Sequence, residues 1–355
     1  MIILNELVLT ILLFTDKMAD LKEGRGRGTK RKLDNNGTTG KKSRGELSTP
    51  PLPPNGYPKE HPFNRDGYRY ILAEADPHAP HRQEFDESSD MAGKPIPGFL
   101  CRVLTPESCS VALHDRAPQL NVSDDRMHVT GTKFYCTARA THGVSRGNWY
   151  YEVKIVEMPD GAATRIGWAQ KNANLQAPLG FDKFGYSCRS RKGTKFHDSI
   201  GKHYCEGYGQ GDVIGCLIEL PDQEIQLPPS FKDKPLIKFK SHLYYEEKDE
   251  LQENLKKLKA LNGSKITFFK NGKSLGTAYE DIYGGEYYPG VGLFKNAHVK
   301  YNFGPKFRYR PEIDSSFKAI CERVKEREVE QTMSDMLYFA DHEGRLKIDN
   351  YYISN

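Results

Sequence analysis

Short runs of aromatic and β-branched residues, separated by turn residues, dominate the sequence between residues 58 and 311. Residues of these types favour the pleated, half-buried surface of a β-sheet, whereas Gly and Pro supply its turns. The clearest runs are 127–130, 149–155, 165–169, 213–220, 266–270 and 299–303. Many short strands at this spacing predict a mainly β protein built as an antiparallel sandwich or barrel.

A hairpin is expected where Asn271 and Gly272 separate the run 266–270 from the next one. A two-residue type I′ turn needs positive φ at both central residues, and Asn-Gly suits that requirement best. The 17 Phe, 20 Tyr, 32 Gly and 21 Pro of the chain agree with an all-β domain connected by loops.

An insertion of about 221–265 interrupts the strand rhythm. Its segment 245–261 is rich in helix formers, and its leucines stand three or four residues apart, at Leu251, Leu255, Leu258 and Leu261. This spacing predicts one short helix within the insertion. The insertion serves either for packing or as a partner surface.

A second, amphipathic helix is predicted over 317–340, within a C-terminal segment of 313–345. One stripe of this helix is apolar and consists of Val329, Met333, Met336, Leu337 and Ala340. Terminal amphipathic helices more often pack on their own domain. Here, however, the long charged stretch 321–328 precedes the stripe. It favours a helix that projects away from the domain and whose stripe is buried by another protein.

The positive charge of the chain is concentrated near its N-terminus. The net charge is +5, but residues 22–46 carry nine basic and three acidic residues, so the remainder stands at −1. With few apolar residues and a proline-rich exit, 22–57 is predicted to be a disordered linker. It serves either for nuclear import and nucleic-acid contact or as a solubilising linker. The candidate nucleic-acid contacts are Arg25, Arg27, Lys30, Arg31, Lys32, Lys41, Lys42 and Arg44.

The first 21 residues are expected to be an unstructured extension, with Met18 as a possible second start. The apolar run 1–14 contains Asn5 and Glu6, has no basic residue before it and is short for a bilayer span, so no membrane association is expected. The seven cysteines are scattered and form no Cys-x-x-Cys pair, which favours the cytosol or nucleus and argues against a zinc site of that type.

Motifs that carry chemistry are weak in this chain. The glycines at 207–211 precede a strand, whereas a phosphate-binding loop opens a helix, so a turn is expected there. His61, His78 and His81 match no usual metal spacing. His203 and Cys205 have no third group to orient them as a nucleophile. We therefore expect no enzymatic activity, no metal and no cofactor.

Several segments occur in the order found in SPRY domains, among them Gly147-Asn-Trp-Tyr-Tyr-Glu-Val, Arg165-Ile-Gly-Trp, Gly211-Asp-Val-Ile-Gly-Cys and Asn302-Phe-Gly-Pro. Longer stretches resemble one subfamily, namely His61-Pro-Phe-Asn-Arg-Asp-Gly-Tyr-Arg-Tyr-Ile-Leu-Ala-Glu, Leu113-His-Asp-Arg-Ala-Pro-Gln-Leu, Asn174-Leu-Gln-Ala-Pro-Leu-Gly and Lys192-Gly-Thr-Lys-Phe-His. Over about 58–340 the chain resembles the trithorax-group Ash2-like family (absent, small or homeotic discs two). The resemblance implies a SPRY-type β-sandwich over 58–312.

The resemblance also implies a nuclear, non-catalytic subunit of complexes that methylate lysine 4 of histone H3. In that family the SPRY domain binds an acidic segment of a retinoblastoma-binding β-propeller subunit, and the pair activates the SET-domain methyltransferase. The implied binding residues are Tyr135, Arg165, Gln176, Pro178, Phe181 and Arg189. Without the family, Arg165 in a strand would more often be a surface or structural arginine. Family members usually have tyrosine where this chain has Phe181.

The C-terminal helix resembles the segment that the family inserts into a groove of a dumpy-30-type helical dimer, and Ala340 is smaller than the residue usual there. The chain lacks the cysteine pairs of the family's N-terminal zinc-finger and winged-helix region, so binding through that module is not carried over. The alternative function is a general SPRY peptide-recognition adaptor outside chromatin.

Overall fold

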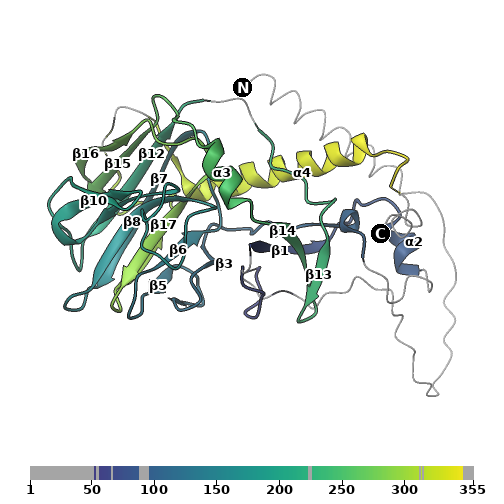
Figure 1. Cartoon of the computed structure of the whole chain (residues 1–355), viewed down its shortest axis with the longest axis horizontal. Helices are drawn as coiled ribbons and strands as arrows, with labels where there is room; N and C mark the ends of the chain where they lie inside the picture. The colour runs from purple at the N-terminus through teal and green to yellow at the C-terminus, as the bar shows by residue number, and fades with distance from the viewer. Residues whose placement is uncertain are drawn as a thin grey trace, which may run out of the picture. The chain divides into compact units, whose positions relative to one another are not determined.

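Figure 1 shows the computed structural model of the chain, which describes Leu52, 56–64, 67–87, 96–222, 226–311, Ile313 and 316–346. The chain divides into two compact units, 1–43 and 44–355, and every described residue belongs to the second. The predicted N-terminal extension, the candidate nucleic-acid contacts and most of the predicted linker lie outside the described residues.

Two antiparallel sheets form the body of this unit. One has the order β11-β10-β9-β8-β17-β6-β3, with bounds Ile200–His203, Thr194–His197, Gly185–Arg189, Ala163–Gln170, Tyr287–Phe294, Cys136–Ala140 and Val111–Arg116. The other has the order β16-β15-β12-β7-β18-β5-β4, with bounds Lys273–Glu280, Lys265–Lys270, Val213–Leu220, Gly147–Glu157, His298–Asn302, His128–Thr130 and Asn121–Val122. The short β19 (Lys318–Ala319) pairs in parallel with β7. The mainly β prediction is therefore confirmed.

The core lies between these two sheets because their strands alternate inward-facing apolar residues with outward-facing ones. On β7, Trp149, Tyr151 and Val153 belong to one buried cluster that also contains Trp168 of β8. The rings of Tyr151 and Trp168 meet edge to face with centroids 5.0 Å apart, an arrangement that aromatic pairs favour. Each of the six strands expected from the sequence is present, with bounds within two residues of those predicted.

The hairpin predicted at Asn271-Gly272 is confirmed. It joins β15 to β16, and both central residues have positive φ, 51° at Asn271 and 84° at Gly272.

A third sheet of four strands lies outside the sandwich, with the order β13-β14-β1-β2 and bounds Leu236–Phe239, His242–Lys248, Tyr68–Ala75 and Cys101–Val103. Two of its strands come from the insertion and two from the segment that precedes the sandwich. The one short helix predicted within the insertion is present, but Tyr245, the first residue of the segment rich in helix formers, pairs with Ile71 within β14 and is fully buried. The helix of the insertion, α3, covers only Leu251–Lys257. Strand pairing and burial of aromatic rings outweigh the helix propensity of the following residues.

The C-terminal helix, α4, spans Arg323–Asp341 and starts later than predicted, since Lys318–Ala319 is a strand and Ile320–Glu322 a 3-10 turn, η4. The helix does not project away as expected. It runs from the sandwich to the four-stranded sheet (Figure 1), where Tyr338 and Phe339 pack on the buried cluster around Tyr245. The remaining short elements are α2 (Arg82–Glu87), η2 (Gly98–Leu100) and η3 (Arg191–Gly193).

Candidate functional site

Arg165 of β8 and Arg189 of β9 are directly opposite each other in the antiparallel ladder. Residues in this position project from the same face of a sheet. Phe196 of β10 lies against both side chains, with its ring centroid 3.7 Å from the guanidinium carbon of Arg165 and 5.0 Å from that of Arg189. The fold therefore brings two arginines together over one aromatic ring.

Neither arginine takes part in any ion pair of the described residues. Arg165 donates from Nη1 to the carbonyl of Leu179 at 3.1 Å, and its Nε is buried without a hydrogen-bond partner. Arg189 donates from Nε to the carbonyl of Arg191 at 3.3 Å. These partners are neutral, so they leave both positive charges uncompensated.

Burial makes this charge costly. Arg165 is only 8% exposed, and its pKa is lowered first by burial and further by the neighbouring charge of Arg189, against the opposing influence of Tyr135. A carboxylate that reached the exposed edge of the pair would relieve the repulsion and gain charge-assisted hydrogen bonds. The arrangement is therefore suited to binding an anion.

Besides Phe196, the ring of Tyr135 contacts Arg165, and two exposed phenylalanines belong to neighbouring segments. The ring of Tyr135 lies 5.4 Å from the guanidinium carbon of Arg165 and stacks on Phe294, with centroids 4.7 Å apart. Phe181 is 49% exposed, and Phe134, next to Tyr135 in the chain, is 68% exposed. Flat apolar walls around a cationic centre favour an extended peptide that carries both acidic and apolar side chains.

The loop 174–181, which carries Gln176, Pro178 and Phe181, is held in place by hydrogen bonds from the sheet. The hydroxyl of Thr137 donates to the carbonyl of Ala177 at 2.7 Å, and the hydroxyl of Ser187 donates to that of Leu179 at 2.7 Å. Gly180 has φ +84°, and a Cβ there would lie 2.3 Å from the carbonyl oxygen of Phe196, so only glycine fits. The rim of the site is therefore preorganised.

The fold thus brings together Arg165 and Arg189 on the sheet and Tyr135 immediately before β6, whereas Gln176, Pro178 and Phe181 lie on the adjoining loop, with Gln176 exposed. Sequence reasoning missed the contribution of Phe196 and Phe294. The position of Phe196 depends on the register in which Thr194 opposes Arg189, because the residue two further on in a strand faces the same side, and this register is a property of the fold.

The predicted apolar stripe of α4 faces outward. Val329, Met336 and Leu337 are 46%, 43% and 53% exposed, Met333 is half-buried, and Ala340 is exposed. The buried face of this helix is polar and comprises Arg323, Glu330, Gln331, Ser334 and Asp335. The fully buried positions of α4 are therefore polar, and its apolar contacts with the clusters come from the partly buried Val324, Tyr338 and Phe339.

Ion pairs attach this polar face to the rest of the chain. Glu330 pairs with Arg146 at 3.3 Å and, within the helix, forms a bidentate pair with Arg323 at 3.0 and 2.6 Å. Arg323 also donates from Nε to the carbonyl of Gly143 at 3.0 Å. Further along the helix, Asp335 lies 3.9 Å from the ammonium of the buried Lys232, which also pairs with Asp76 at 2.5 Å. The apolar stripe is thereby held in a fixed orientation.

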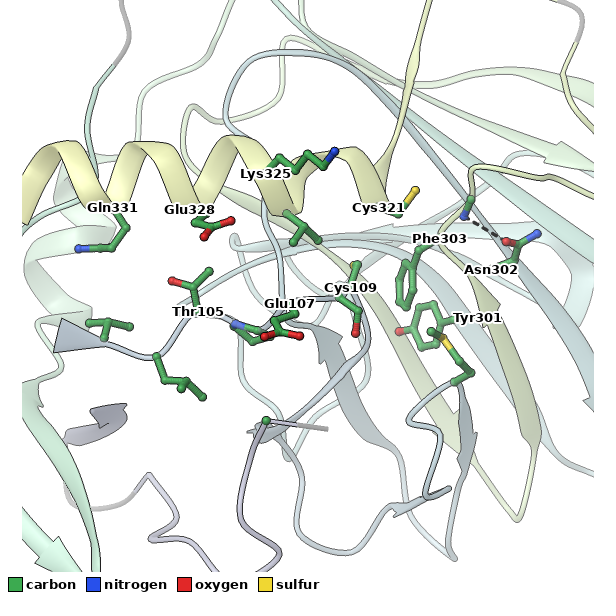
Figure 2. A pocket seen from close by; sticks show the side chains of 18 of the residues that line it. Thr105, Glu107, Cys109, Tyr301, Asn302, Phe303, Cys321, Lys325, Glu328 and Gln331 are labelled. Atoms are coloured by element: carbon green, nitrogen blue, oxygen red, sulfur yellow. Dashed lines mark hydrogen bonds between the residues drawn. The ribbon is translucent and has the colours of Figure 1, made fainter. Parts of the chain in front are cut away.

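Figure 2 shows a separate pocket of about 1400 Å³ beneath α4. Glu328 and Lys325 of the helix lie on one wall, and Thr105 and Glu107 lie on the opposite one. None of the predicted site residues lines it. Its lining includes both acidic and basic side chains.

The other motifs considered in the sequence acquire no functional assignment within the described residues. The glycines at 207–211 lead directly into β12. Within the described part of the chain, no group of three or more His, Cys, Asp or Glu side chains is arranged to hold a metal ion. No helix of that part is both long and apolar enough to span a bilayer.

Comparison with known proteins identifies the sandwich. Residues 148–227 and 260–306 match the SPRY domain family. The chain is 60% identical to the Set1/Ash2 histone methyltransferase complex subunit ASH2 of Drosophila melanogaster, over 88% of this chain and 58% of that protein. This chain is a SPRY-domain relative of the ASH2 subunits.

Two further ASH2 relatives match with lower identity. The Set1/Ash2 histone methyltransferase complex subunit ash-2 of Caenorhabditis elegans is 44% identical, over 82% of this chain and 52% of that protein. The Set1 complex component ash2 of Schizosaccharomyces pombe is 29% identical, over 80% of this chain and 47% of that protein. The chain thus spans about half the length of these ASH2 proteins, which are named as subunits of methyltransferase complexes.

Proposed function

We propose that this chain is a non-catalytic scaffold and activator subunit of a nuclear complex that methylates lysine 4 of histone H3. Its arginine pair binds an acidic segment of the retinoblastoma-binding β-propeller subunit, and the two together support the SET-domain methyltransferase. The names of the ASH2 relatives support the complex, and the carboxylate-free arginine pair carries the proposed binding mode.

The chemistry of the pair explains why an acidic peptide is the preferred ligand. Guanidinium groups form two parallel hydrogen bonds to one carboxylate, which an ammonium group cannot match. Arg165 and Arg189 share contact with Phe196, which restricts both side chains, so they lose little freedom on binding. The exposed ring of Phe181 covers apolar parts of the peptide without offering a hydroxyl group.

Replacing either arginine tests this assignment. We expect Arg189→Ala or Arg165→Ala to weaken binding of the isolated acidic propeller segment by about 1.5–3 kcal/mol, the range for hydrogen bonds to charged groups. Titration calorimetry measures the affinity. The matched control is Arg102→Ala, which removes an arginine already paired with Glu74 at 2.7 Å on the four-stranded sheet. Equal affinities of the folded Arg165→Ala/Arg189→Ala variant and the parent would reject the site.

The same proposal assigns α4 to a dumpy-30-type helical dimer. The groove of such a dimer would cover the stripe Val329, Met333, Met336, Leu337 and Ala340, which the chain leaves on its surface. The basic segment 22–46 is assigned to nucleosomal DNA, on the strength of its charge.

A further inference from the structure

Two free thiols meet at the edge of the sandwich core, close to the arginine pair. Cys188 belongs to β9 and is fully buried, whereas Cys205 follows β11 and is partly exposed. Their sulfur atoms lie 3.9 Å apart, within hydrogen-bonding distance for sulfur. Cys205 is therefore the more accessible thiol of the pair, and Cys188 is the buried one.

The two thiols differ in acidity. The hydrogen bond from Cys188 lowers the pKa of Cys205, and the positive charge of Lys270 lowers it further, against the opposing effect of burial. The same hydrogen bond, together with burial, raises the pKa of Cys188. Cys205 is also the more exposed of the two, so both its position and the direction of its pKa favour it over Cys188 as the thiol that reacts first.

We propose that Cys188 and Cys205 form a peroxide-reactive site that closes a reversible disulfide. The Cys205 thiolate attacks a hydroperoxide, the O–O bond breaks, and the sulfur becomes a sulfenic acid while the departing alkoxide or hydroxide takes up a proton. The sulfur of Cys188 then attacks that of Cys205, and hydroxide leaves with the thiol proton as water. Two electrons pass from the sulfurs to the peroxide.

Closing the bond would move the segment that carries Cys205. A disulfide is about 2.05 Å long, so the sulfurs must approach each other by about 2 Å. Cys188 cannot follow easily, because β9 is paired on both sides, with Ile166 of β8 and Lys195 of β10. Cys205 lies in the loop that follows β11 and is outside the ladder, so its segment moves more easily than β9.

This movement would be transmitted to Arg189. The carbonyl of Gly193 accepts hydrogen bonds from the amides of both Tyr204 and Cys205 at 3.0 Å, and a Cβ at Gly193 would lie 1.9 Å from the carbonyl oxygen of Cys205. The turn η3 therefore moves with residue 205. That turn includes Arg191, whose carbonyl accepts the hydrogen bond from Arg189. Oxidation thus weakens acidic-peptide binding, an effect that rests on the proposed function.

The thiol chemistry is tested first, on the full chain. The protein is treated with hydrogen peroxide, remaining thiols are alkylated, and tryptic peptides are mapped by mass spectrometry. We expect a linked pair of peptides containing Cys188 and Cys205, which dithiothreitol separates. Cys205→Ser should abolish the link, and Cys321→Ser, which removes another half-buried thiol, should leave it intact. Linkage of different cysteines, or an unlinked Cys205 after oxidation, would overturn the proposed pair.

The effect on binding is tested with the same oxidised and reduced samples and the acidic propeller segment. Oxidation should weaken binding by about tenfold, which corresponds to ~1.4 kcal/mol, and Cys205→Ser should make affinity independent of peroxide. Equal affinity of a fully linked and a reduced sample would refute the transmission through η3. Failure of the reduced chain to bind the peptide would refute the proposed function instead, and the peptide map would still decide the thiol pair.

Discussion

Arg165 differs from the buried Arg139 and Arg323 in what it contacts. Arg139 pairs with Asp115 at 2.6 Å, and Arg323 pairs with Glu330 at the same distance. Such pairs compensate the cost of removing a charge from water. Arg165, 8% exposed, meets a carbonyl and two aromatic rings instead. Arg126, 5% exposed, also donates to a carbonyl, that of Tyr57, and not to a carboxylate, so an unpaired buried charge alone does not mark a site. What favours anion binding at Arg165 is the second guanidinium, that of Arg189, directly opposite it.

The buried His142 gives the protein a sensitivity to acid. Burial first, and then the charges of Arg327 and Arg323, lower its pKa from 6.5 to about 4. Between pH 6.5 and pH 4, His142 binds a proton in the unfolded chain but stays neutral in the folded chain. The free energy of unfolding therefore falls as the pH drops through this range. The loss from this residue approaches ~3 kcal/mol at the acid end of that range.

Denaturant titrations of His142→Phe and the parent between pH 7 and pH 4 measure this contribution. The variant should show a shallower decline of the free energy of unfolding, because its ring has no proton to bind. His114, whose pKa is also lowered to about 4 by burial, supplies part of the remaining slope. If the free energy of unfolding declined equally with pH in the variant and in the parent, a role for His142 would be excluded.

Lys232 should be among the residues most costly to replace. Its side chain is 1% exposed and that of its partner Asp76 is 4% exposed. Lys232→Met leaves the Asp76 carboxylate buried without its cation, and removal of one partner of a buried pair typically costs about 3–5 kcal/mol. The control Lys240→Met breaks a pair that is 63% and 72% exposed, where the expected loss is below about 1 kcal/mol. Equal stabilities of the two variants by urea titration would contradict this difference.

At the scale of elements, α4 shows that an apolar stripe does not decide which side of a helix is buried. The sequence pattern correctly indicated an amphipathic helix with its stripe at Val329, Met333 and Leu337. It did not indicate that Arg323, Glu330 and Asp335 would form the inner face. Their partners Gly143 and Lys232 are roughly 100–180 residues away in the chain, so no local pattern contains them.

A charge placed in the stripe tests its proposed partner. Leu337→Asp should abolish co-purification of the chain with a dumpy-30-type dimer, because a carboxylate would be buried in an apolar groove. Thr332→Asp adds the same charge to an exposed position of α4 outside the stripe and should keep binding. Because Leu337 is 53% exposed, both variants should unfold at the same denaturant concentration as the parent. Normal co-purification of Leu337→Asp would reject the assignment of the stripe.

At the scale of the whole molecule, the charge of the chain is divided between a basic N-terminal segment and a nearly neutral remainder. A nucleic-acid contact made by such a segment depends strongly on salt, since each neutralised phosphate releases counterions. Salt should therefore weaken nucleic-acid binding by the basic segment without a matching effect on peptide binding by the sandwich.

Deletion of residues 22–46 tests this division. Nucleosome affinity should fall, and the slope of log affinity against log salt should flatten by about 0.9 for each phosphate that the segment no longer neutralises. Binding of the acidic propeller segment should stay the same, because the arginine pair lies in the sandwich. An unaltered salt slope would rule out DNA contact by the segment.

The order of amino acids alone specified the local features of this protein: strand positions, the Asn271-Gly272 hairpin and the two amphipathic segments, each of which depends on neighbouring residues. The family resemblance supplied Arg165 and Arg189 as candidates. The folded structure was needed to establish that they share Phe196 without a carboxylate, that Tyr245 is a strand residue of a third sheet, and that α4 buries its polar face. These features depend on contacts between distant segments, whose energies outweigh local propensity once the chain is compact.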